Sequence, residues 1–198
     1  MLAIDSFRAN ISRARELGEL FNSLSAITTP ALAINDLLRS QLVMAVSALD
    51  HYVHEVVRQG MVEIYDGIRP QVPGFSKFQV SLVEAKASIP TASSAWVDNA
   101  IRQSHSFLSF QHPEKLADAI RLVHPDPIWP ALEVRMGVSA SDLKEQLKLI
   151  VDRRNKIAHE ADVDPSYPGV RWPIAYHDST TATDFIENLV VAINDEVA

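Results

Sequence analysis

One stretch of the chain, Leu32 to Asp66, decides the fold: LAINDLLRSQLVMAVSALDHYVHEVVRQGMVEIYD. Its apolar residues recur at three- and four-residue steps, which places them on one face of a helix: Leu38, Leu42, Ala45, Leu49, Tyr52, Val56 and Ile64. Upstream, ITTPA offers Thr28 or Thr29 as an N-cap and Pro30 in the first turn, and Gly67 ends the helix. At 1.5 Å per residue this helix is roughly 50 Å long, so we expect it to be the spine of a bundle.

Shorter amphipathic segments lie on both sides of this spine. The same periodicity predicts a helix over Asp5 to Leu24 and a strong one over Ser141 to Ala161, which starts at an N-cap of Ser139 or Ser141 and stops before Pro165. Weaker helical segments are expected at Ser76–Ser88, Ser93–Phe110, Pro113–Val123, Asp126–Met136 and Thr183–Val197, with a loop over Asp164–Tyr176. No repeat and no strand-like alternation is present, so the sequence predicts an all-α fold with one domain over residues 1–198.

Composition excludes several classes of protein. The chain has no cysteine, so disulfide frameworks, thiolate metal sites and a cysteine nucleophile are ruled out together. Charged residues interrupt the N-terminal segment where a secretory signal needs an apolar run, and no apolar run approaches the ~20 residues of a membrane span. We therefore expect a cytoplasmic protein. The net charge of -7 argues against broad coating of nucleic acid, although basic residues do gather in one segment: Lys144, Lys148, Arg153, Arg154 and Lys156.

That basic segment ends in RNKIAHE, Arg154 to Glu160, in which an arginine, a polar residue and a histidine are spaced along one helix. Such a pair is common by chance, and Arg171 with His177 is a second example in this chain. Pro173 breaks any helix across the second pair, whereas the first pair lies at the end of a strongly periodic helix. Context therefore singles out Arg154 and His159.

Histidine and arginine in this arrangement fit the chemistry of RNA cleavage. Histidine titrates near neutrality, so it can take a proton from a ribose 2′-hydroxyl or return one to the leaving oxygen. Arginine stays charged and can stabilise the negative charge that builds up on the phosphorus. Along a helix, Arg154 and His159 point about 140° apart, so a site shared by two such helices would suit them better. The alternative is that both residues only cap the end of a helix.

The sequence also resembles a known family. RNKIAHEAD, the DPSYPGVRWPI loop after it and SALDHYVHEVV on the long helix are similar to the RiboL-PSP branch of the HEPN superfamily, over roughly Leu32 to Val191. The resemblance implies an all-α HEPN-like bundle that forms a homodimer. It also implies an endoribonuclease that needs no cofactor and no metal, in a toxin-antitoxin or phage-defence setting with an antitoxin or defence-system partner.

On this resemblance, Arg154 and His159 are the expected catalytic residues. Asn155 and Asp50 are expected to support them, Asp50 or Glu55 as an acidic partner that orients Arg154 or His159. Arg153 and Lys156 are expected to bind RNA.

Two alternatives to this assignment stay open. The stripe of His51, His54 and their acidic neighbours can equally be a solvated face beside the core, and a metal site there is less favoured because the Glu-x-x-His spacing of helical di-metal sites is absent. A HEPN module that binds a partner without catalysis, or one half of a complex in which the partner neutralises it, is the alternative function.

Overall fold

The fold is built on two long helices that lie side by side. In this computed structural model, which describes residues 2–29, 32–88, 93–167 and 169–197, α1 (Ala3–Ser25) and α2 (Asn35–Tyr65) form an antiparallel hairpin. Their registration is visible at both ends: the Ala3 amide donates to Gln59, and Gly18 lies against the side chain of Gln41. The shorter elements that follow are the 3-10 turn Phe75–Lys77, α3 (Leu82–Ser88), α4 (Ala95–His105), α5 (Pro113–Ile120), α6 (Ile128–Met136), α7 (Ala140–His159) and α8 (Tyr176–Val197).

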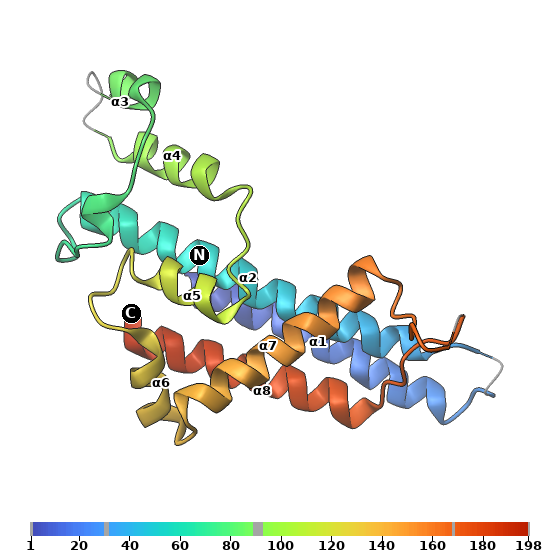
Figure 1. Ribbon diagram of the computed structural model, residues 1–198. Helices are drawn as coiled ribbons and strands as arrows, with labels where there is room; N and C mark the ends of the chain where they lie inside the picture. Colours follow the sequence, from blue (N-terminus) through green and yellow to red (C-terminus); the bar gives the residue numbers. More distant parts are fainter. Residues whose placement is uncertain (1, 30–31, 89–92, 168, 198) are drawn as a thin grey trace.

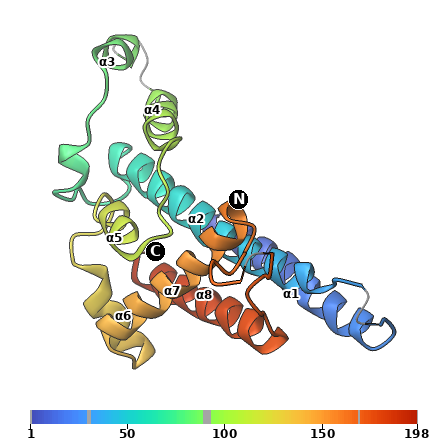
Figure 2. The ribbon, with the colours of Figure 1, turned by 45° about the vertical axis from the view of Figure 1, so that its right-hand side comes forward.

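Around this hairpin, α7 and α8 complete the bundle (Figure 1). α8 runs parallel to α2, because Ser179 donates to the carbonyl of Leu38 and Tyr52 reaches Asn194 farther along. α7 packs on α2 in the opposite direction, while α4 packs on the far end of α2 and α3, which contacts α4, extends away from the bundle (Figures 1 and 2). Large side chains from these helices, such as Phe7 and Leu189, are fully buried. The all-α fold expected from the sequence is confirmed.

Several predicted boundaries differ from the structure. α2 begins at Asn35, not at Thr28 or Thr29, and Pro30 lies outside the described residues. α8 begins at Tyr176, seven residues before the predicted start at Thr183. Its first turns bury the polar Ser179 and Thr183 against α2, so they lack the apolar stripe from which a helix is predicted. Hydrophobic periodicity cannot detect a helix whose buried face is polar.

Smaller differences affect the other helices. Ser76–Ser88 divides into a 3-10 turn and α3, and Ser93–Phe110 shortens to α4. α7 ends two residues before the predicted Ala161, whereas its predicted N-cap is confirmed: Ser139 Oγ accepts from the amide of Asp142 at 3.1 Å. Within the described residues, no helix is long and apolar enough to cross a membrane.

A buried histidine sits where α4 packs on α2. The His105 side chain is 5% exposed, lies among Phe78, Phe110 and His54, and leaves its Nδ1 without a hydrogen-bond partner in the described structure. Burial, with a smaller contribution from His54, lowers the pKa of His105 from 6.5 to about 4. The folded chain therefore favours neutral His105.

This burial predicts that the fold loses stability in mild acid. The unfolded chain protonates His105 near pH 6.5 but the folded chain only near pH 4, so the stabilisation is full above about pH 6.5 and declines as the pH falls toward 4. At ~1.4 kcal/mol per pKa unit the loss is up to about 3 kcal/mol. Urea unfolding of wild type and His105→Phe at about pH 7.5 and about pH 5 measures it.

The variant should lose less stability than wild type between the two pH values, since phenylalanine fills the aromatic site without titrating. His177→Gln, at an exposed position of α8, is the matched control and should follow wild type. An equal loss in His105→Phe and wild type would contradict the prediction.

Candidate functional site

The candidate site lies on the last turns of α7, which end directly after His159. The amides of Glu160 and Asp162 both donate to the carbonyl of Lys156 at 3.0 Å, which satisfies a backbone acceptor that a helix end leaves open. Ala161 and Asp162 then take left-handed conformations with φ of 52° and 58°. Because non-glycine residues adopt this region only at a cost, surrounding contacts must hold the turn in place.

Arg154 faces inward from α7 and is only partly exposed. Its Nη1 donates to Oδ1 of the neighbouring Asn155 at 3.0 Å, and its Nε is buried with no partner in the described structure. The structure thus brings these two predicted residues together. The buried Nε is out of reach of an added anion, whereas the guanidinium as a whole is partly exposed and can bind one through its outer nitrogens.

His159 lies one turn farther along and points away from Arg154 by about 140°. Its side chain is exposed, and none of the described residues forms a hydrogen bond or ion pair with it. The imidazole is therefore available to a group from outside the chain. Among the described residues, no hydrogen bond or ion pair joins the two predicted catalytic side chains.

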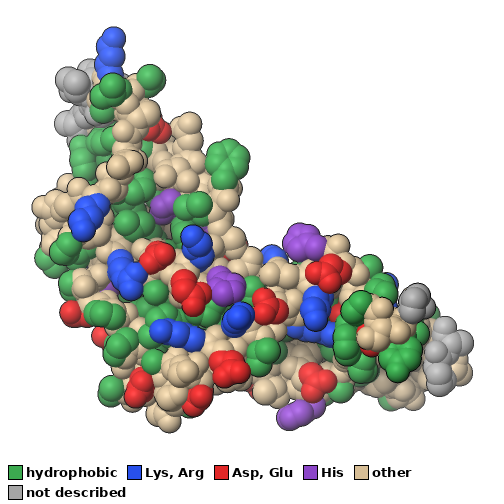
Figure 3. Space-filling model, in the orientation of Figure 1, with side chains coloured by type: hydrophobic (Ala, Val, Ile, Leu, Met, Phe, Trp, Pro, Cys, Tyr) green, Lys and Arg blue, Asp and Glu red, His purple; other side chains and the backbone are tan. Residues whose placement is uncertain are grey.

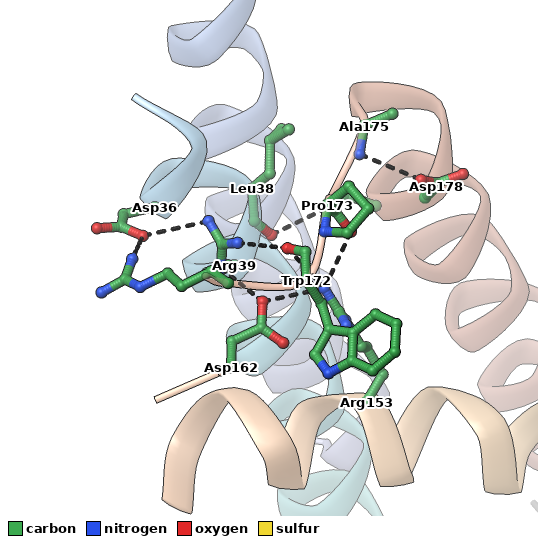
Figure 4. Close-up of polar contacts among 11 residues, drawn as sticks. Asp36, Leu38, Arg39, Arg153, Asp162, Trp172, Pro173, Ala175 and Asp178 are labelled. Carbon is green, nitrogen blue, oxygen red and sulfur yellow. Dashed lines mark hydrogen bonds and ion pairs between the residues drawn. The ribbon is translucent and has the colours of Figure 1, made fainter. Parts of the chain in front are cut away.

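A buried carboxylate beside this helix end organises the surrounding loop. Asp162 is 1% exposed, and its Oδ2 accepts from Nε of Arg39 on α2 at 2.7 Å and from Nη2 of Arg153 on α7 at 3.0 Å. The same two arginines donate to the carbonyl of Trp172, at 2.7 and 3.4 Å. Figure 4 shows Asp162 between the two guanidiniums, with the Trp172 loop running past them. α2, α7 and the loop before α8 meet at this cluster.

The two predicted RNA-binding residues have different surroundings. Arg153 is engaged inside the cluster, where its Nη2 also donates to the carbonyl of Pro173 at 3.1 Å. Lys156 is exposed, and its Nζ lies 5.6 Å from the centre of the Trp172 ring. Of the two, Lys156 can turn toward a phosphate without giving up a hydrogen bond.

Asp50 lies on the middle of α2 and has its own partners within the chain. Its Oδ1 accepts from the Phe110 amide at 2.6 Å and from Ser109 at 3.4 Å, and it lies 4.0 Å from Nε2 of His54. Asp50 therefore holds the segment between α4 and α5, and none of these contacts is with Arg154 or His159.

Glu55 likewise pairs within the α2–α4 contact, with Arg58 at 2.9 Å and Arg102 at 3.5 Å. Burial opposes the ionised form, but the hydrogen bond and the charges of Arg58 and Arg102 outweigh it and lower the pKa of Glu55. His51, one turn before Glu55, is exposed. No group of three or more His, Cys, Asp or Glu side chains that could hold a metal occurs among the described residues.

Sequence reasoning missed the roles of Arg39 and Asp162. The only local signal is an arginine near the start of a long helix, among residues that face the core, and its partner lies 123 positions away.

The surface around the site carries no continuous basic band on the face drawn in Figure 3, where acidic and basic side chains alternate along the bundle. On this face, any anion-binding capacity is therefore local.

Comparison with known proteins agrees with this architecture. The model of the family described as RiboL-PSP-HEPN matches residues 8–198, which include the spine helix, the end of α7 and α8. Neither a curated protein nor a solved structure matches the chain. The family match extends over nearly the whole sequence, so the chain belongs to the RiboL-PSP-HEPN family.

Proposed function

We propose that this protein is a metal-independent endoribonuclease whose site is assembled from Arg154 and His159 of two copies of the chain. The observation that carries the proposal is the end of α7: an exposed imidazole without a partner among the described residues follows a partly exposed guanidinium that pairs only with Asn155 among them. Membership of the HEPN family supports an RNase or nucleotide-binding role. The imidazole and the guanidinium supply what cleavage of a phosphodiester by its own 2′-hydroxyl requires, which is proton transfer and stabilisation of negative charge.

In the proposed reaction, His159 of one chain takes the proton of the ribose 2′-hydroxyl, and the 2′-oxygen attacks the adjacent phosphorus. Arg154 stabilises the extra negative charge of the five-coordinate phosphorus, with Asn155 holding one of its donors. The bond to the 5′-oxygen then breaks, and His159 of the second chain supplies the proton to that oxygen. The products are a 2′,3′-cyclic phosphate and a 5′-hydroxyl.

Two copies are needed because one chain offers only one exposed histidine at this helix end, and one imidazole cannot act as base and acid in a single step. A two-fold dimer would also place Arg154 beside the partner's histidine, which relaxes the 140° divergence on one helix. Lys156 lies on the same exposed surface as His159 and would contact a flanking phosphate.

The second candidate is a HEPN module that binds a protein partner, such as an antitoxin or another defence component, without cleavage. The net charge of -7 and the alternating charges of the visible face favour it, since a surface of this kind binds nucleic acid weakly outside a local site. It shares the fold and the dimer with the enzyme, so catalysis separates the two.

The first test is the loss of cleavage in site variants. His159→Ala removes the proton-transferring group and Arg154→Ala removes the charge that stabilises phosphorus, so each should lower kcat by at least ~10²-fold while the chain stays folded. Cleavage of labelled RNA, with circular dichroism of each variant, measures both effects.

Two variants serve as matched controls: His177→Ala at an exposed position of α8, and Arg121→Ala, whose guanidinium pairs only with Asp118 among the described residues. Both should cleave as wild type does. Full activity in folded His159→Ala would refute the site, and a wild type inert on every RNA tried would make the binding module the better account.

Independence from metal is the second expectation, because RNA supplies its own nucleophile and the imidazole moves the proton. Excess EDTA should leave the initial rate within about twofold of its original value, and the 5′ fragments should end in 2′,3′-cyclic phosphate by mass spectrometry. Complete loss in EDTA, restored by a divalent cation, would instead point to a metal-assisted reaction.

The third expectation concerns the shared site. Wild type and His159→Ala are mixed in equal amounts and allowed to exchange subunits, and the activity is compared with that of wild type at the same total concentration. About a quarter of that activity should remain if both histidines of a dimer are required, and about half if each acts alone. Light scattering should show a dimer at micromolar concentration. An active monomer would contradict this arrangement.

A further inference from the structure

We infer that Asp162 and Arg39 form a clamp that positions the end of α7 for catalysis; this rests on the proposed function. The segment from Arg154 to His159 is enclosed between two residues that bind each other, since Arg153 directly precedes it and Asp162 follows three residues after it. Asp162 is bound in turn by Arg39 of the spine helix, which shares the Asp162 carboxylate and the Trp172 carbonyl with Arg153. Asp162 and Arg39 act as positioning residues, because they hold the reacting side chains without touching the reacting atoms.

Asp162 connects to α7 through its backbone as well as through its carboxylate. Its amide donates to the carbonyl of Lys156 at 3.0 Å, and its carbonyl accepts from the Trp172 amide at 2.9 Å. Three residues past His159, the chain is therefore held on one side by the helix and on the other by the loop. The left-handed backbone of Asp162, with φ of 58°, is the conformation that these bonds impose.

Arg39 attaches the clamp to the spine helix α2. It lies near the start of α2, is 8% exposed, and donates Nε to Asp162 and Nη2 to the Trp172 carbonyl, both at 2.7 Å. A planar guanidinium that donates two hydrogen bonds fixes the orientation of its partners as well as their distance. The register of α7 against α2 at this end is thus set by a polar contact.

The chemistry of the cluster argues for positioning over stability alone. Burying ionised groups has a desolvation cost that apolar packing would avoid, and Oδ1 of Asp162 is buried without a partner in the described structure. Helix ends otherwise fray over their last turn. Catalytic side chains lose up to ~10²-fold in rate when they are displaced by about 1 Å, so a fixed helix end directly after His159 serves the reaction.

Asp162→Asn tests the clamp, because the amide keeps the size of the side chain and one acceptor but loses the charge that both arginines share. Asp164→Asn is the matched control: Asp164 is a second buried carboxylate in the same loop, and its side chain accepts a hydrogen bond from the amide of Ser166, within the loop. Arg39→Lys is a second variant that keeps the charge on α2 and removes the forked donor.

In Asp162→Asn and Arg39→Lys we expect kcat to fall by at least ~10-fold with KM changed less than about threefold, because the misplaced groups act in the transition state. Hydrogen exchange of the amides from Lys156 to Glu160 should quicken by roughly tenfold, while that of the first turns of α7 stays unchanged. Asp164→Asn should match wild type in both measurements. The double variant should be no slower than the slower single variant, since both changes break one interaction.

Each result decides a separate point. Unchanged exchange at the end of α7 in both folded variants overturns the clamp, whatever the activity. Faster exchange with unchanged kcat overturns its role in positioning and leaves it structural. A wild type that cleaves no RNA overturns the proposed function, and with it the clamp's role in cleavage, while the exchange measurement still reports on the contact itself.

Discussion

Burial of α2 on almost every side is the constraint on which the rest of this structure depends. Its buried residues include pairs of neighbours in the chain, such as Ala48 with Leu49 and Tyr52 with Val53, so no single stripe accounts for them. α1, α7, α8 and the shorter α4 and α5 all pack on it. A helix whose apolar face is this broad has to be covered by several neighbours, and this requirement sets where the helices that pack on it can lie.

Close approach to α2 also needs small residues at particular positions. A Cβ on Gly60 would come within 2.8 Å of the Val123 side chain, so glycine lets the segment after α5 pack directly on the spine. Gly18 plays the same part for α1, where a Cβ would meet the Gln41 side chain at 2.7 Å. Contacts this short exclude any larger residue unless the neighbour moves.

The end of α7 is held by a different kind of contact from its middle. Leu143, Leu147 and Val151 bury the middle of the helix, but past Val151 the helix carries the partly exposed Arg154 and the partly buried Ile157 before the chain turns away. Polar contacts take over at this point, with Asp162 as their centre. A polar end leaves charged and titratable side chains near the surface, which a purely apolar helix end would not provide.

The sequence by itself determined the helices with an apolar stripe, the Ser139 cap and the position of Arg154 and His159 at the end of a helix, because all of these follow from residues within a few turns of one another. Tertiary structure alone decided that Arg39 joins Asp162, that Asp50 holds Phe110, and that α8 starts at Tyr176. Those outcomes depend on polar pairs between residues far apart in the chain. Hydrophobic periodicity reports which face is hidden from water, and it carries no information about which distant donor a buried carboxylate will meet.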